Sequence, residues 1–162
     1  MTLERLTNER WGFSSNCFVC EPSNGAGLRQ PFFHDTDAAL VVADLELGPE
    51  HSGAPTYVHG GVQLALLDEA MAWAAIAVAE RFAVTSTIRS EFHRPIRVGK
   101  RYRLEAAIAE RTAERFEATA RIVDDEGRVR TSATATLVVL SAAQAVDAGA
   151  PSDASSSGFV RP

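Results

Sequence analysis

Cysteine is scarce in this chain of 162 residues: the only two are Cys17 and Cys20, in the stretch C-F-V-C. Two cysteines alone do not complete a zinc site, which usually has four protein ligands. Residues 1–16 carry several Glu and Arg side chains and no apolar run of the kind found in a secretory signal. We therefore expect a cytoplasmic protein, in which a structural disulfide is disfavoured. Local packing is the simpler interpretation of the two cysteines, with metal binding or redox chemistry as the alternatives.

An excess of positive charge is also missing, since the formal net charge is −5. This balance disfavours a general role in nucleic-acid binding. An uninterrupted apolar span is missing as well, because the best candidate, residues 60–79, has Asp68 and Glu69 at its centre. Each carboxylate would cost roughly 2.5–3.5 kcal/mol on insertion into a membrane. The composition, 46% hydrophobic and 23% charged, is typical of one soluble globular domain with a substantial core.

The most informative segment is residues 57–80, which read Y-V-H-G-G-V-Q-L-A-L-L-D-E-A-M-A-W-A-A-I-A-V-A-E. Its apolar residues predict a helix that begins after His59, ends near Glu80 and Arg81, and is buried on several sides. Buried carboxylates are costly unless they are paired or used. A helix N-terminus also suits an oxygen atom that carries negative charge. The segment therefore has a chemical character as well as a packing role.

Hydrophobic alternation indicates strands on both sides of this helix. Ahead of it we expect strands over 28–33 and 38–47, followed by a loop over 48–56. After it, three segments alternate apolar and polar residues, which predicts an antiparallel sheet with one covered face. These segments are residues 101–110, 115–122 and 128–137, with a hairpin turn at 125–127, and residues 84–93 are predicted to form a further strand.

The predicted architecture is α+β, with an antiparallel sheet wrapped around the long central helix. We divide the chain into an N-terminal segment, residues 1–16, a domain over 17–141, and a tail over 142–162. The tail consists mostly of Ala, Ser, Gly, Pro and Asp, and this composition predicts disorder.

Three motifs resemble one known family. They are V-H-G-G-V-Q-L-A-L-L-D-E-A at 58–70, C-F-V-C-E-P-S-N-G-A-G-L at 17–28 and R-S-E-F-H-R-P-I-R-V-G at 89–99. Together they make the chain similar to the hotdog-fold acyl-CoA thioesterases of the 4-hydroxybenzoyl-CoA and phenylacetate-pathway type. The similarity covers roughly residues 15–140. It implies the hotdog fold, hydrolysis of an acyl-CoA to free acid and coenzyme A, and no cofactor or metal, since coenzyme A is part of the substrate.

The resemblance also implies roles for particular residues. Gly60 would supply a backbone N–H to the thioester carbonyl, and Asp68 would act as nucleophile or general base. Thr85, at the start of the next strand, would assist. The chain departs from the family pattern at Gly53, where a polar residue is common, so we expect His51 or His59 to take over that role. A second departure is Glu21, where the family motif has Gly.

The spacing of Gly60 and Asp68 carries a geometric constraint. Eight helical residues rise about 12 Å, so one carbonyl cannot contact the Gly60 N–H and Asp68 of the same helix. Two antiparallel helices related by a two-fold axis would resolve this, with each site built from Gly60 of one subunit and Asp68 of the other. We therefore expect a homodimer, or a homotetramer made of two such dimers, with composite sites.

Each candidate also has a purely structural interpretation. Gly60 and Gly61 would suit any helix start that needs small residues, or Gly61 would be a second carbonyl donor. Asp68 would be a structural acid paired with an arginine. Glu69 lies about 100° around the helix from Asp68. We therefore expect Glu69 to have a structural or supporting role, and direct contact with the substrate is the alternative. His59 would be a helix cap, and Thr85 an ordinary strand residue.

Five basic residues cluster around one end of a predicted strand. They are Arg89, Arg94, Arg97, Lys100 and Arg101. Arg89 and Arg94 are candidates to bind the phosphates of coenzyme A, because guanidinium groups suit phosphate oxygens. The alternative is a solvated basic surface.

Two other functions stay open at this point. One is a hotdog acyl-thioester dehydratase, in which a His and an acid act at the β-carbon. The other is a non-catalytic acyl-CoA-binding module that does not need Asp68.

Overall fold

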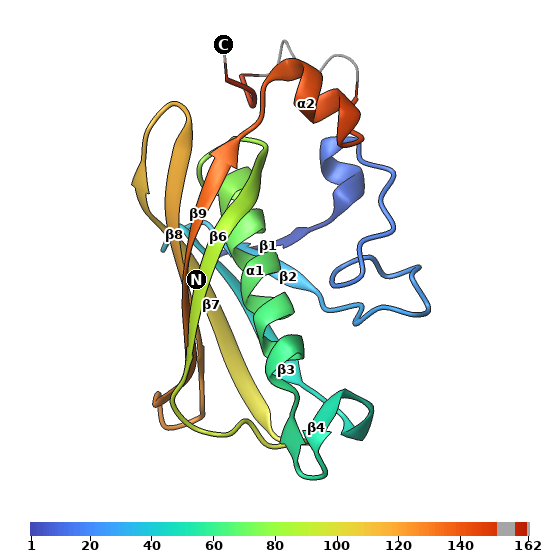
Figure 1. Ribbon diagram of the computed structural model, residues 1–162, viewed down its shortest axis with the longest axis vertical. Coiled ribbons are helices and arrows are strands. Elements are labelled where there is room, and N and C mark those ends of the chain that lie inside the picture. Colours follow the sequence, from blue (N-terminus) through green and yellow to red (C-terminus); the bar gives the residue numbers. More distant parts are fainter. Residues whose placement is uncertain (152–157, 162) are drawn as a thin grey trace.

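The computed structural model describes residues 1–151 and 158–161, and it contains one large antiparallel sheet around a central helix (Figure 1). The helix is α1, Gly60–Ala77. The sheet has the strand order β1-β2-β3-β7-β8-β9-β6. Its strands are β1 Leu3–Leu6, β2 Phe32–Asp35, β3 Leu40–Glu46, β6 Ala83–Phe92, β7 Arg101–Arg111, β8 Arg115–Val123 and β9 Val129–Val139. The predicted α+β class, a sheet wrapped around one helix, is confirmed.

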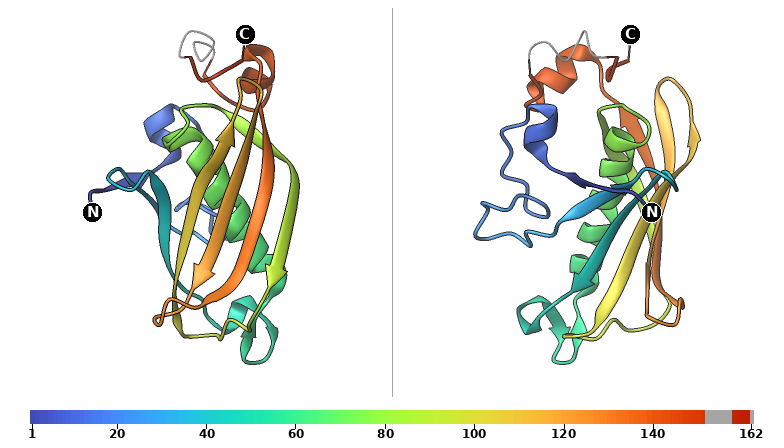
Figure 2. Two further views of the ribbon diagram at one scale, coloured as in Figure 1. Left: turned by 90° about the vertical axis from the view of Figure 1, so that its left-hand side faces the viewer. Right: turned by 180° about the vertical axis from the view of Figure 1, so that it is seen from behind.

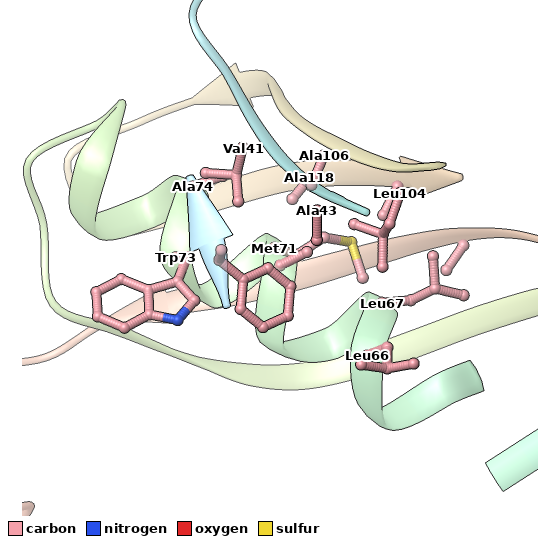
Figure 3. Packing of buried hydrophobic residues seen from close by; sticks show 14 of the residues in the cluster. Val41, Ala43, Leu66, Leu67, Met71, Trp73, Ala74, Leu104, Ala106 and Ala118 are labelled. Atoms are coloured by element: carbon pink, nitrogen blue, oxygen red, sulfur yellow. The ribbon is translucent and has the colours of Figure 1, made fainter. Parts of the chain in front are cut away.

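The inner face of the sheet packs on α1 and forms the main core. β8 shows the predicted alternation, since Phe116, Ala118, Ala120 and Ile122 are buried and the residues between them are exposed. In Figure 3, the side chains of Leu67 and Met71 lie beside residues from the inner face of the sheet. The labelled sheet residues there are Val41, Ala43, Leu104, Ala106 and Ala118.

α1 is not buried on all sides within one chain. Leu66, Leu67, Ala70, Met71 and Ala74 are fully buried against the sheet. A second face, which carries Gly61, Leu64, Ala65, Asp68 and Ala72, keeps partial or full exposure to solvent. An apolar helix face without cover within one chain is suited to contact with another molecule. None of the helices in the described residues has the length and apolarity needed to cross a membrane.

The N-terminal part of the chain is more closely joined to the sheet than the sequence indicated. β1 pairs with β2 in the register Leu3↔Asp35 to Leu6↔Phe32, so residues from the predicted N-terminal segment extend the sheet. The strand expected over 28–33 begins only at Phe32. Residues 28–30 form other backbone hydrogen bonds, from Leu28 N–H to Phe18 O and from Gln30 N–H to Val19 O, each 2.8 Å.

The segment between β3 and α1 is also more ordered than a plain loop. It contains the 3-10 helix η2, Pro49–His51, and a small sheet of β4, Ser52–Ala54, with β5, Tyr57–Val58. A second 3-10 helix, η1, Asn8–Trp11, precedes the cysteine motif. Trp11 of η1 packs against Trp73 of α1 with ring centroids 5.5 Å apart.

The expectation of a disordered tail is wrong for the residues that follow β9. Helix α2, Ala142–Asp147, begins with a capping box formed by Ser141 and Gln144. It covers a small second core around Phe82, which includes Leu140, Ala145 and Ala150. The chain then returns, and Phe82 N–H donates to Phe159 O at 2.8 Å. Figure 2 shows α2 and the C-terminal end at one end of the sheet. Alanine packs well beneath an aromatic ring, so a low content of large apolar residues did not prevent order here. The prediction of disorder for 152–157 and 162 lies outside the described residues.

Candidate active site

The N-terminus of α1 presents one free backbone donor. His59 is the N-cap, and its Nδ1 accepts a hydrogen bond from the Gly61 N–H at 2.8 Å. The N–H groups of Val62 and Gln63 donate to His59 O. The Gly60 N–H has no hydrogen-bond partner in the part of the chain that is described, and Gly60 is half-buried. The capping interpretation of His59 is therefore confirmed, and its imidazole occupies the Gly61 N–H that was expected to be a second carbonyl donor.

Gly60 lies against the ring of Phe92, at the end of β6. A Cβ atom at position 60 would lie 3.3 Å from Phe92 Cε1. Phe92 pairs with Thr131 and so faces the helix side of the sheet, yet its side chain is largely exposed. The Gly60 amide therefore lies beside an exposed aromatic ring, which leaves room for an apolar ligand group.

A buried polar pair fixes the first turn of α1. Gln63 Nε2 donates to Val58 O at 3.0 Å, and Thr131 Oγ1 donates to Gln63 Oε1 at 2.5 Å. Both side chains are buried and satisfied, so they hold the helix start against β5 and β9. The contact between Gln63 and Thr131 was not predicted from the sequence. Its only sequence signals are a single Gln in an apolar helix and a Thr at an inward position of β9.

The structure brings two of the candidate site residues, Asp68 and Thr85, into contact. Thr85 Oγ1 donates to Asp68 Oδ1 at 2.7 Å. The interpretation of Asp68 as the partner of an arginine is not supported, since no ion pair involves it within residues 1–151 and 158–161. Asp68 is only partly buried, and among the described residues its Oδ2 has no hydrogen-bond partner.

A β-bulge turns Thr85 toward the helix. The register between β6 and β9 runs Thr85↔Leu137 and then Thr87↔Thr136, so Ser86 is the extra residue. Leu137 is fully buried, whereas Thr136 is only partly buried and Thr87 is exposed, which places Thr85 on the inner face and Thr87 on the outer face. Without the bulge, strand alternation would place both threonines on the same face.

Glu69 points away from Asp68 and toward the cysteine motif. Glu69 Oε1 lies 3.4 Å from Cys17 Sγ, in a hydrogen bond. Burial raises the pKa of Glu69 to about 7, and the adjacent charges of Cys17 and Asp68 act in the same direction. A hydrogen bond from the Cys20 thiol, together with bonds from the Cys20 and Val19 amides, lowers the pKa of Cys17 to about 5. The hydrogen bond between the two thiols raises the pKa of Cys20.

The remaining predicted substrate-binding residues lie at different places. His51, in η2, accepts the His59 N–H through its backbone oxygen at 2.8 Å, so it lies beside the helix start. Arg94 is exposed just beyond Phe92. Arg89 pairs across the sheet with Thr134, on the outer face, and forms an ion pair with Glu91 at 3.2 Å. The structure does not bring Arg89 to the face that carries Gly60 and Asp68.

The site is open at the edge of the sheet. β6 is the last strand of the sheet, so its free edge pairs with no other strand in the described residues. A hollow of about 780 Å³ lies elsewhere, around the ends of β3 and β7 and the β8–β9 turn. Neither Gly60 nor Asp68 lines it. The amide and the carboxylate therefore lie at an open surface of the single chain.

One antiparallel sheet wrapped around a long helix is the architecture of the hotdog class of folds. Comparison with known proteins agrees with this class: residues 56–131 match the profile of the thioesterase superfamily. The predicted resemblance to this superfamily is thereby confirmed. A comparison with curated proteins found no match.

Several solved structures share the fold. A thioesterase superfamily protein superposes with a TM-score of 0.71 at 23% identity, over 76% of this chain and 60% of that protein's length. The E. coli PaaI protein of the phenylacetic acid degradation operon gives a TM-score of 0.58 at 19% identity, covering 63% and 73% of the two chains. A Streptococcus mutans protein bound to acetyl-CoA gives a TM-score of 0.59 at 16% identity, covering 62% and 81%.

Proposed function

We propose that this protein is a cytoplasmic acyl-CoA thioesterase that acts as a homodimer, or as a homotetramer of two such dimers. One observation carries the proposal: within the described residues, the Gly60 amide has no hydrogen-bond partner at the N-terminus of α1, and the same helix carries the Asp68 carboxylate, which Thr85 orients. The superfamily match over residues 56–131 supports the reaction class. The CoA ligand of the fold relative from Streptococcus mutans supports the choice of substrate.

The Gly60 N–H would stabilise the oxygen of the thioester carbonyl as it becomes an oxyanion. The positive end of the α1 dipole and the absence of a competing acceptor both favour this role. Loss of one such donor costs about 10²–10³-fold in kcat in other enzymes. The exposed ring of Phe92 would contact the acyl group beside the carbonyl.

Asp68 would promote attack on the carbonyl carbon in one of two ways. As a general base it removes a proton from water, the water oxygen bonds to the carbon, and collapse of the intermediate expels the CoA thiolate, which takes that proton. As a nucleophile it bonds to the carbon itself, releases the thiolate, and forms an anhydride that water then hydrolyses. In both routes Thr85 holds Asp68 Oδ1, which leaves Oδ2 directed at the substrate.

The two groups would come from different subunits. α1 runs unbroken from Gly60 to Ala77, so the distance along its axis between Gly60 and Asp68 is about 12 Å. The partly exposed face of α1 around Ala65 and Asp68, together with the free edge of β6, would be covered by a second copy of the chain. Pairing of the two β6 edges would extend the sheet and satisfy backbone groups that are otherwise unpaired.

Arg94 would bind phosphate groups of coenzyme A, because it is exposed near the Gly60 end of the site. Arg89, on the outer face, would serve only a nucleotide portion that passes over the sheet edge. The hydrolysis proposed here needs no separate cofactor and no metal.

The test is the Asp68→Asn variant, assayed for release of free CoA from acyl-CoAs that range from acetyl to long-chain and aryl. We expect wild-type hydrolysis of at least one class and a fall in kcat of about 10²–10⁴-fold in the variant. Asp125→Asn, in the exposed β8–β9 turn, is the matched control and should keep full activity. Hydrolysis by Asp68→Asn at the wild-type rate contradicts the mechanism. Binding of acyl-CoA without turnover by the wild type identifies a binding module, and loss of water from a 3-hydroxyacyl-CoA identifies a dehydratase.

A further inference from the structure

We propose that Cys17, Cys20 and Glu69 form a binding site for a divalent cation of the zinc type. The two thiol sulfurs and a Glu69 carboxylate oxygen lie within 4.8 Å of one another. They come from two separate elements, the turn at 17–20 and the middle of α1. Two thiolates and one carboxylate make a ligand set that favours Zn²⁺ over Mg²⁺ or Ca²⁺.

The spacing of the ligand atoms suits tetrahedral coordination. With Zn–S bonds of about 2.3 Å and Zn–O bonds of about 2.0 Å, a tetrahedral site has sulfur–oxygen distances of about 3.5 Å and sulfur–sulfur distances of about 3.8 Å. Cys17 Sγ lies 3.4 Å from Glu69 Oε1. This distance fits a tetrahedral site, and the other two pairs of ligand atoms lie within 4.8 Å of each other.

The cysteine turn is held in place by its own backbone. Phe18 O and Val19 O accept hydrogen bonds from the Leu28 and Gln30 N–H groups, each at 2.8 Å. Gly27 lies so close to Phe18 O that a side chain at that position would collide with it. A turn fixed in this way loses little further freedom when it binds a ligand.

Hydrogen-bond donors already point at the two sulfurs. The Val19 N–H donates to Cys17 Sγ at 3.4 Å, and Asn8 Nδ2 donates to Cys20 Sγ at 3.7 Å. Such outer contacts orient thiolate ligands and reduce their excess negative charge. The three protein ligands would leave one position of the tetrahedron for water.

Glu69 lacks a cationic partner of its own. Within the described residues no Lys, Arg or His forms an ion pair with it, although most acids that are removed from solvent have such a partner. A divalent cation would supply the missing charge. From the sequence, metal binding was only an alternative interpretation of the two cysteines, because two ligands do not complete a zinc site and a third ligand 52 residues away could not be placed.

The experiment uses the purified full chain, reduced and freed of metal with a chelator. Cobalt(II) is added first, and the thiolate-to-cobalt absorption band is followed as Zn²⁺ displaces the cobalt. We expect one equivalent of Zn²⁺ per chain, protection of both thiols from a thiol reagent, and a higher unfolding temperature in the presence of Zn²⁺. Cys17→Ser and Cys20→Ser should each weaken the band, while Glu69→Gln should keep it and reduce the Zn²⁺ affinity at least about tenfold.

Glu21→Gln is the matched control. Glu21 follows Cys20 directly but accepts hydrogen bonds from Asn8 and Ser23 and does not belong to the cluster, so this variant should bind Zn²⁺ like the wild type. The proposal is overturned if the wild type shows no cobalt band, or if Glu69→Gln and Glu21→Gln bind Zn²⁺ equally. It is also overturned if both thiols react with the thiol reagent as fast in the presence of Zn²⁺ as in its absence.

Discussion

Composite active sites predict that two inactive variants restore activity in each other. The first variant is Gly60→Pro, which removes the backbone N–H that we assign to the oxyanion. Position 60 is the first helical residue, where proline is tolerated. His59 has φ −59° and ψ 135°, a conformation that suits the residue before a proline. The second variant is Asp68→Asn. Each homodimer alone should lose about 10²-fold or more of its kcat.

A heterodimer of the two variants contains one doubly defective site and one intact site. The intact site combines Gly60 of the Asp68→Asn chain with Asp68 of the Gly60→Pro chain. Its activity should therefore be about half that of a wild-type dimer, which is about 50-fold or more above either parent. The heterodimer is obtained by co-expression with two different affinity tags, and release of free CoA is the assay.

The control variant is Gly60→Ala, which keeps the N–H but places the same Cβ 3.3 Å from the Phe92 ring. If Gly60→Ala is as inactive as Gly60→Pro, steric contact and not the lost donor explains the defect. If the heterodimer is as inactive as its parents, each site lies within one chain and the composite arrangement is wrong. Full activity of a monomer in solution would refute it equally.

Two further predictions concern Thr85 and Asp124. Thr85→Val removes the hydrogen bond to Asp68, so kcat should fall about tenfold or more with little change in KM. Thr87→Val, on the outer face, should have no effect. If both variants lower kcat equally, Thr85 does not position Asp68. Burial alone would raise the pKa of Asp124, but bonds from Arg128 and Arg130 outweigh it and hold that pKa well below the usual range. Asp124→Asn should therefore lower the unfolding temperature at pH 7. The difference in unfolding temperature between wild type and variant should shrink as the pH falls below about 4, where Asp124 of the unfolded state takes up a proton. A difference that is the same at pH 7 and pH 3 would contradict this.

The parts of the fold that follow from hydrophobic periodicity were predictable. The four strands after α1 lie close to their predicted ranges, and three of them alternate apolar and polar residues over many positions. The helix was predicted from its all-round apolar composition, since it shows no amphipathic period. Thr85 and Asp68 were each singled out through the family resemblance, but the hydrogen bond between them was not predicted. Periodicity could not find the bulge at Ser86, because a bulge inserts one residue without a compositional signal.

Short elements and long-range polar contacts were the parts that sequence could not supply. β1 has only four residues and α2 only six, so neither shows enough of a period to be recognised. The bond between Gln63 and Thr131 spans 68 positions of the chain, and the contact between Cys17 and Glu69 spans 52. Such contacts depend on the complete fold, and a single sequence contains no information on which distant polar residues will meet.

The two adjacent carboxylates of α1 show how one helix can carry unlike groups. Because neighbouring residues differ by about 100° around the axis, Asp68 faces Thr85 and the open edge of the sheet, while Glu69 faces the turn that holds Cys17. Each acid thus has its own hydrogen-bond donor, which offsets part of the cost of placing it in an apolar helix. A substitution at Glu69 would disturb the cysteine turn without removing a group from the proposed reaction, whereas the same change at Asp68 would remove the group that attacks the thioester.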